Sequence, residues 1–304
     1  MSLTSLDPVP PAPLELGAGE PAVARHGLMR ALWRSRNGRV GLVLVVLVVA
    51  AAISAAFGGT PYDPQFQNSS ALLAAPSWSH PFGTDQFGRD ILSLVLDGIG
   101  VSLKIACLSV LIAGGIGTIA GIVAGFLGRW TSAVIMRITD MLFAIPAILL
   151  ALIVVAALGA GWLNSAIAIG VGYIPIFVRV VRGPVLSLRE SGYVLAGRVL
   201  GFSRRRLLFR HILPNVAGIL AVQVSLALAW SVLAEASLSF LGLGPPPPTA
   251  SLGEMVYQSA SSGLAAIDWW TLAFPSVMIV LAVIGFNLLG DGLRDAIDPR
   301  TRKR

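Results

Sequence analysis

The chain has 304 residues, of which 55% are hydrophobic and only 12% are charged, and its mean hydropathy is +0.80. A soluble domain carries about 25% charged residues, so this composition excludes an ordinary soluble protein and indicates an integral membrane protein. The net charge of +7 comes mainly from arginines that lie between apolar segments, which argues against nucleic-acid binding. The single cysteine, Cys107, lies in an apolar segment and predicts neither a disulfide nor a metal cluster.

Apolar segments divide the sequence into predicted transmembrane helices. A bilayer core about 30 Å thick needs about 20 apolar residues for each helix. Six uncharged segments approach or reach this length, at residues 40–57, 105–127, 141–158, 162–178, 212–234 and 271–289. The predicted fold class is therefore all-α integral membrane. The first segment exceeds the usual length of a signal-peptide core, so we expect an uncleaved helix. Residues 1–24, rich in proline and glycine, are expected to be disordered.

The basic residues predict the orientation in the membrane. Twenty of the 22 lie before the first predicted helix, in the turn after the second, in the loop after the fourth or at the C-terminus, and only Arg89 and Lys104 lie on the other side. Because cytoplasmic loops carry an excess of lysine and arginine, both termini are predicted to be cytoplasmic. The expected parts are a cytoplasmic segment 1–39, a transmembrane domain 40–290 with an outer segment 58–100 and a cytoplasmic loop 184–211, and a basic cytoplasmic tail 291–304.

The outer segment holds a polar motif followed by an amphipathic stretch. Residues 88–97 place their apolar side chains largely on one helical face, which predicts a separate helix lying in the outer membrane interface. His80 and Asp85 could suggest catalysis, but the sequence arranges neither a serine nor a cysteine nucleophile with them. We expect the motif to brace the outer surface and not to bind solute. Its candidate residues are Gly83, Thr84, Asp85, Gly88, Arg89 and Asp90.

Several residues inside the predicted spans have two interpretations. Gly117, Gly121 and Gly125 repeat every four residues, so a second helix can approach their face, either within this subunit or from a partner. Pro146 and Pro175 each remove a backbone hydrogen bond and predict kinks. A carboxylate is costly within a membrane. Glu235, near the outer end of the fifth span, is therefore expected either to face the solute path or to reach headgroup water.

The loop after the fourth span interleaves apolar residues with arginines, and Gly201 divides it into two predicted short helices. Such a surface either docks a soluble partner or lies against anionic lipid. This stretch resembles the EAA loop of ABC importer permeases. It matches that motif at Tyr193, Val194, Ala196, Arg198, Leu200, Gly201 and, without a break, from Phe209 to Asn215. It departs at Leu195, where the family usually has glutamate, and at Gly197, usually alanine.

Residues 83–93, 235–244 and 286–300 resemble the same family, and together the four stretches resemble the C-type subunit of dipeptide, oligopeptide and nickel permeases. The resemblance implies the type I importer permease fold, a bacterial inner-membrane location and a heterodimer with a B-type permease. It also implies that loop residues 193–201 dock one or two ABC ATPases, and that an extracytoplasmic binding protein delivers the solute.

The chain has no Gly-Lys pair and so no phosphate-binding loop, which predicts that it is not an enzyme and that ATP-Mg is hydrolysed on a separate subunit. The expected function is peptide import, with nickel or glutathione import as the alternative. A remote alternative is an ion-coupled carrier, for which only Glu235 is a candidate intramembrane carboxylate, since Asp140 is expected at a membrane edge.

Overall fold

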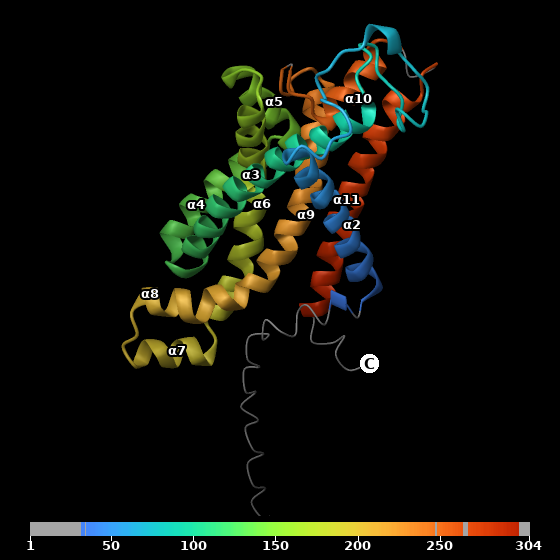
Figure 1. Ribbon diagram of the computed structural model, residues 1–304. Helices are drawn as coiled ribbons and strands as arrows, with labels where there is room; N and C mark the ends of the chain where they lie inside the picture. Colours follow the sequence, from blue (N-terminus) through green and yellow to red (C-terminus); the bar gives the residue numbers. More distant parts are fainter. Residues whose placement is uncertain (1–31, 34, 247, 264–266, 298–304) are drawn as a thin grey trace, which may run out of the picture.

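The computed structural model describes residues 32–33, 35–246, 248–263 and 267–297 (Figure 1). Within them the chain is helical, and its only β-type pairing is one bridge between Thr84 and Asp90. The predicted disorder of residues 1–24 lies outside the described residues, as do most of segment 1–39 and the end of the C-terminal tail.

Five helices are long and apolar enough to cross a membrane. They are α2 (Arg36–Ala56), α3 (Ile91–Phe126), α6 (Trp162–Arg189), α9 (Leu213–Phe240) and α11 (Trp270–Ile297). A sixth span is formed if α4 (Arg129–Phe143) and α5 (Ala147–Leu158) are taken together, although they are bent by 85° at the break between them. The prediction of six spans is therefore confirmed in this sense. Pro146 is the N-cap of α5, which agrees with the predicted disruption there, whereas α6 continues through the buried Pro175.

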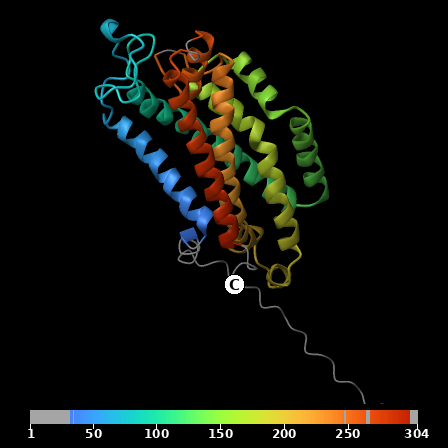
Figure 2. The same ribbon diagram turned by 90° about the vertical axis from the view of Figure 1, so that its right-hand side faces the viewer.

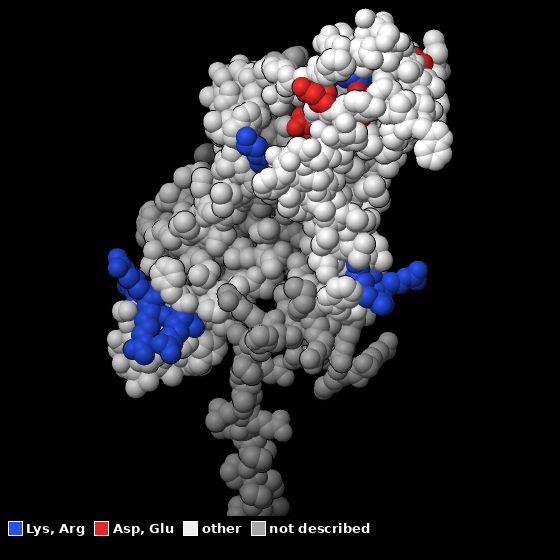
Figure 3. Space-filling model, in the orientation of Figure 1, with Lys and Arg blue, Asp and Glu red and all other residues white. Residues whose placement is uncertain are grey.

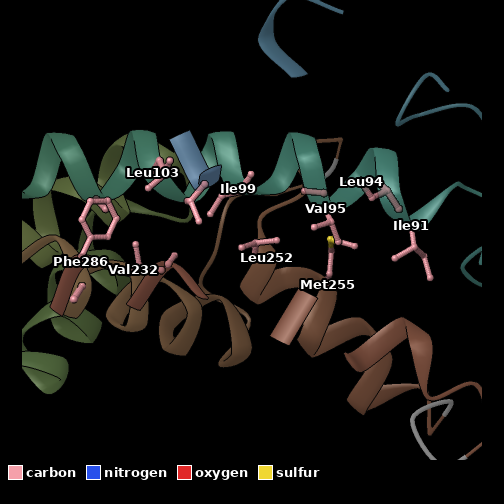
Figure 4. Packing of buried hydrophobic residues seen from close by; sticks show 14 of the residues in the cluster. Ile91, Leu94, Val95, Ile99, Leu103, Val232, Leu252, Met255 and Phe286 are labelled. Atoms are coloured by element: carbon pink, nitrogen blue, oxygen red, sulfur yellow. The ribbon is translucent and has the colours of Figure 1, made fainter. Parts of the chain in front are cut away.

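The long helices pack side by side, with α3 against α6 and α11 between α2 and α9. In Figures 1 and 2, α2 lies at one edge of the bundle and the α4–α5 pair at the other. The largest core cluster lies at the outer-segment end of α3 (Figure 4). There the α3 residues Ile91, Val95 and Ile99 are buried against α9, α11 and the short helix α10 (Leu252–Ser261).

The predicted separate interfacial helix at residues 88–97 is wrong. Asp90 caps a helix that begins at Ile91 and runs without a break to Phe126, so the amphipathic stretch is the first part of α3. Its apolar face is buried by protein and does not lie on lipid: Ile91, Leu94 and Val95 belong to the main core. Periodicity placed Ile91, Leu92, Val95 and Leu96 on the apolar face, but the structure buries Leu94 and Ser93 with Ile91 and Val95 and leaves Leu92 and Leu96 half-buried.

The glycine face of the second span packs within this chain. A Cβ added at Gly117 would lie 2.5 Å from the Cβ of Phe177, and one added at Gly121 would lie 2.8 Å from the carbonyl oxygen of Val178. At Gly125 it would lie 2.6 Å from Cγ1 of Val185 on the same helix, α6. Of the two interpretations, close packing within the subunit therefore describes all three glycines.

The two ends of the bundle differ in structure and charge. One end holds α7 (Gly192–Val199), α8 (Arg204–Leu207), a π-helix (Leu208–Ile212), the start of α2 and the end of α11 (Figure 1). The opposite end holds α10 and the outer segment, which includes a 3-10 helix (Ser69–Ala71). On the face shown in Figure 3, most lysine and arginine side chains gather at the α7–α8 end, and the acidic side chains lie near the other end. Helix α11 continues to Ile297, so the predicted tail 291–304 begins inside a helix.

Candidate functional site

The loop between α6 and α9 is built around a glycine turn. Helix α7 ends at Val199, and Gly201 follows with a φ of +76°, a conformation that favours glycine. The Gly201 N–H donates to the Arg198 carbonyl oxygen at 3.0 Å, and the Phe202 N–H donates to that of Gly197 at 2.9 Å. This pattern is a Schellman motif. The prediction that Gly201 divides the loop into two helices is confirmed, and the reason is its backbone conformation.

One face of α7 packs on the rest of the loop. Val194 is fully buried, and a Cβ added at Gly197 would lie 2.9 Å from Cδ2 of Leu207 and 3.2 Å from Cδ2 of Phe202. Alanine, the usual family residue at Gly197, would therefore require these side chains to move by a few tenths of an ångström. Glycine at this position lets α7 lie close to Leu207 of α8.

The other face of α7 is apolar and open. Val199 is 88% exposed and Leu200 is 72% exposed, and Tyr193, Leu195 and Ala196 are exposed beside them. Large exposed apolar side chains gathered in this way mark a surface that binds either a protein or a membrane. Leu195 lies on this open face, so the surface presents an apolar side chain where the family usually has a glutamate. The Arg198 guanidinium lies back over the Phe126 ring, 5.3 Å from its centre.

The second half of the loop anchors the surface to the transmembrane helices. Ser203 caps α8 by accepting a hydrogen bond from the Arg206 N–H at 3.3 Å. Leu207 and Ile212 are then buried in one cluster with side chains from three spans, namely Phe126 of α3, Val181 and Val185 of α6 and Val216 of α9. The loop therefore packs directly on α3, α6 and α9.

Hydrogen bonds join Thr84 of the outer motif to the segment before it and to Trp270 at the start of α11. Thr84 is fully buried; its Oγ1 donates to the Ala71 carbonyl oxygen at 2.5 Å and accepts from the Ala74 N–H at 2.8 Å. The Trp270 Nε1–H donates to the Thr84 carbonyl oxygen at 3.2 Å. Gly83, with a φ of +74°, passes so close to Trp270 that a Cβ there would lie 2.8 Å from the indole ring.

The charged residues of this motif are bonded within the chain. Asp85 Oδ1 accepts from the N–H groups of Phe87 and Arg89 at 2.8 and 2.9 Å, which closes the turn at Gly88, and Arg89 Nε donates to Asp85 Oδ2 at 2.7 Å. The same guanidinium reaches Gln258 of α10 at 3.3 Å.

Asp90 caps α3 and also binds a histidine. Its Oδ2 accepts from both the N–H and the hydroxyl of Ser93 at 2.8 Å, while Oδ1 lies 3.0 Å from His80 Nδ1. These contacts hold the start of α3 against the segment that precedes it. His80 contacts a helix cap, and not a nucleophile.

Glu235 sits in a cage of serine hydroxyls. Ser102 of α3 donates to its Oε2 at 2.8 Å, and Ser239, one turn further along α9, donates to its Oε1 at 2.8 Å. Ser239 also lies 3.2 Å from Ser251, which caps α10. With 1% exposure, the carboxyl group does not reach water at the outer surface, so that interpretation is wrong; it joins α3, α9 and α10 instead. The serines were missed in the sequence, although Ser239 lies one helical turn from the carboxylate.

One further ion pair was not predicted. Arg179 Nη2 of α6 lies 2.8 Å from Asp140 Oδ1 of α4, next to the break between α4 and α5. Among the described residues, His, Cys, Asp and Glu nowhere gather in groups of three or more that could hold a metal ion.

Comparison with known proteins gives consistent matches along most of the chain. Residues 117–303 match the family model described as binding-protein-dependent transport system inner membrane component. A putative peptide transport system permease protein of Brucella suis is 43% identical over 273 residues, covering 90% of this chain and 91% of the relative. A dipeptide transport system permease protein of Alkalihalophilus pseudofirmus is 40% identical, covering 89% of this chain and 88% of the relative.

A glutathione transport system permease protein of Pectobacterium atrosepticum is 42% identical, covering 86% of each chain. Among solved structures, an inward-facing conformation of the MetNI methionine ABC transporter is similar in fold, with a TM-score of 0.56 at 20% identity. That match covers 67% of this chain and 97% of the other, and it shows the fold of an ABC transporter permease.

Proposed function

Because this chain belongs to the family of binding-protein-dependent transport system inner membrane components, we propose that it is a permease subunit of an ATP-driven importer of di- and oligopeptides. The observation that carries the substrate class is the alignment, over about nine-tenths of both chains, with relatives named for peptide and dipeptide transport. The relative named for glutathione transport supports a related alternative, since glutathione is itself a modified tripeptide.

The chain forms half of the solute path in a complex. Its partners are a B-type permease, one or two ABC ATPases that bind and hydrolyse ATP-Mg, and an extracytoplasmic binding protein. The complex lies in the bacterial inner membrane, with both termini of this chain in the cytoplasm. The concentration of arginines at the α7–α8 end of the bundle supports this orientation.

Coupling to ATP hydrolysis runs through the loop around α7. The exposed apolar side chains of Leu195, Val199 and Leu200 bind the ATPase, and Gly197 and Gly201 give this surface its shape. When the ATPases close on ATP, they displace α7, and the buried Leu207 and Ile212 carry the movement to α3, α6 and α9. The outer motif at Gly83 to Asp90 holds the outer ends of α3, α10 and α11 together while the helices rock.

The proposal is tested with the complex co-purified with this chain and reconstituted into vesicles. ATP inside the α7-side compartment is expected to drive uptake of a radiolabelled dipeptide supplied with its binding protein. A non-hydrolysable ATP analogue is the control. Competition by glutathione and by Ni²⁺ separates the alternatives, because each blocks dipeptide uptake only if it shares the path. Dipeptide uptake that needs no ATPase subunit would contradict the assignment and support an ion-coupled carrier.

A further inference from the structure

A charged pair lies beside the break in the third span. Asp140 and Phe143 belong to the last turns of α4, and Arg179 lies on the facing helix α6. The guanidinium is 2.8 Å from Asp140 Oδ1 and lies over the Phe143 ring, 4.0 Å from its centre. The Asp140 side chain is 55% exposed and that of Arg179 is 41% exposed, so the chain itself does not enclose the pair.

The pair lies at membrane depth. At about 1.5 Å per residue, Arg179 lies about 15 Å from the end of α6 at Arg189 and about 25 Å from its start at Trp162. Asp140 is about 16 Å from the start of α4 at Arg129. Arg179 is therefore not at the end of its helix, and Asp140, three residues before the end of α4, lies inside the span that α4 and α5 form when they are taken together.

The surface around the pair is unsuited to lipid for two independent reasons. Hydrocarbon solvates neither member of an exposed ion pair. The backbone of residues 144–146 leaves the helix at an 85° bend, and these residues are also exposed. Irregular backbone at membrane depth is found where it is covered by protein or lines a water-filled cavity. Both features lie on the α4–α5 pair, at the edge of the bundle away from α2 (Figure 2).

We propose that Asp140 and Arg179 line the aqueous path and bind the two charged ends of the solute, Arg179 the carboxylate of a peptide and Asp140 its ammonium group. This inference rests on the proposed function, since it assumes a zwitterionic peptide. In the empty path each group neutralises the other. The carboxylate of a zwitterionic solute takes the place of Asp140 beside Arg179, and its ammonium group takes the place of Arg179 beside Asp140. Because the solute has no net charge, the net charge of the site stays the same. The Phe143 ring positions the guanidinium throughout.

The first test asks whether water reaches the pair, and it does not depend on the solute. Cys107, which is exposed, is first replaced by serine. Asp140→Cys and Ala144→Cys are then treated with a charged, water-soluble thiol reagent in the reconstituted complex, and Ala144→Cys leaves the ion pair intact. The control is Leu47→Cys, on the exposed apolar face of α2. Because the thiolate is the reactive form, we expect both probes to react on the order of tenfold faster than the control. Equally slow reaction would overturn the proposal.

The second test asks what the pair recognises. Uptake of a free dipeptide is compared with that of its N-acetylated and C-amidated forms. Arg179→Gln is expected to raise KM for the free dipeptide about tenfold or more, as when one charge-assisted hydrogen bond is lost, with a smaller effect on the C-amidated form. Asp140→Asn is likewise expected to raise KM for the free dipeptide, with a smaller effect on the N-acetylated form. Arg129→Gln, an exposed charge at the start of α4 about 16 Å from Asp140, is the control and should change neither.

The outcomes separate the two proposals. If the wild-type complex takes up no peptide, the proposed function fails, and the thiol reaction still decides whether the pair faces water. If the wild type takes up peptide and the two substitutions reduce uptake of free and blocked peptides equally, the pair is structural and this inference is wrong.

Discussion

Replacing Gly201 should uncouple ATP hydrolysis from transport while leaving the chain inserted in the membrane. Gly201 has a φ of +76° at the end of α7, and a Cβ added there would meet nothing within 4 Å. Any side chain therefore adds backbone strain without a clash inside this chain. A non-glycine residue in the left-handed region costs roughly 1–2 kcal/mol, which corresponds to about a tenfold change in the population of the native turn.

The series Gly201→Asn, Gly201→Ala and Gly201→Trp separates strain from bulk. Asparagine tolerates positive φ better than alanine, so it should retain most of the coupling. Alanine should weaken it through strain alone. Tryptophan adds a large side chain beside the exposed Leu200, on the surface proposed to bind the ATPase. Gly192→Ala is the matched control, because Gly192 also has open space around it but lies in the first turn of α7 without a positive φ.

Two measurements follow each variant: co-purification of the ATPase with this chain, and dipeptide uptake per ATP hydrolysed in vesicles. We expect Gly192→Ala to keep the coupling of the wild type. Coupling should then fall from Gly201→Asn through Gly201→Ala to Gly201→Trp, in which it is nearly lost. Wild-type uptake by Gly201→Trp would show that this loop is not the coupling site. Equal losses in Gly192→Ala and Gly201→Ala would show that the positive φ is irrelevant.

Four further predictions concern the other sites. Leu195→Glu, which introduces the usual family residue on the open face of α7, should retain ATPase binding, and loss of the ATPase on co-purification would contradict this. Asp90→Ala should destabilise the detergent-purified complex by about 1–2 kcal/mol through loss of the α3 cap, more than Asp63→Ala at an exposed turn, without changing solute preference. Glu235→Ala leaves two buried serine hydroxyls without their acceptor and should lower the free energy of unfolding by about 1–3 kcal/mol, whereas Glu235→Gln should lower it less. A Glu235→Ala variant as stable as the wild type would contradict the serine cage. In a Cys107→Ser background, Ser261→Cys should react with an impermeant thiol reagent on intact cells and Arg205→Cys should not, and the reverse result would invert the orientation.

The sequence predicted what depends on composition and periodicity. Apolar length located the spans, the arginine distribution separated the two ends, and Gly201 marked the turn because few other residues adopt its conformation. The glycines of α3 were recognised as a close-packing face, but their partner was not, since spacing does not say which helix approaches. Phe177 and Val185 supply that partner on α6.

Other features depend on tertiary contacts. Residues 88–97 have the pattern of a surface helix, and only the presence of α10 and α11 turns that face into core. The serines around Glu235 come from three separate segments, so no local pattern joins them. The Arg179–Asp140 pair is 39 residues apart in sequence, and either residue alone fits a membrane edge.

Helix α6 connects the two proposed sites. Its lower half carries Val181 and Val185, which pack in one cluster with Leu207 and Ile212 of the coupling loop, and Arg179 lies less than one turn before Val181. Proteins are densely packed and deform little, so a push on α7 moves this part of α6 as a unit. Asp140 lies on α4, which packs on both α3 and α6 and ends at the 85° break. A movement that the coupling loop passes to both α3 and α6 would therefore carry α4 with it and leave Arg179 and Asp140 in contact.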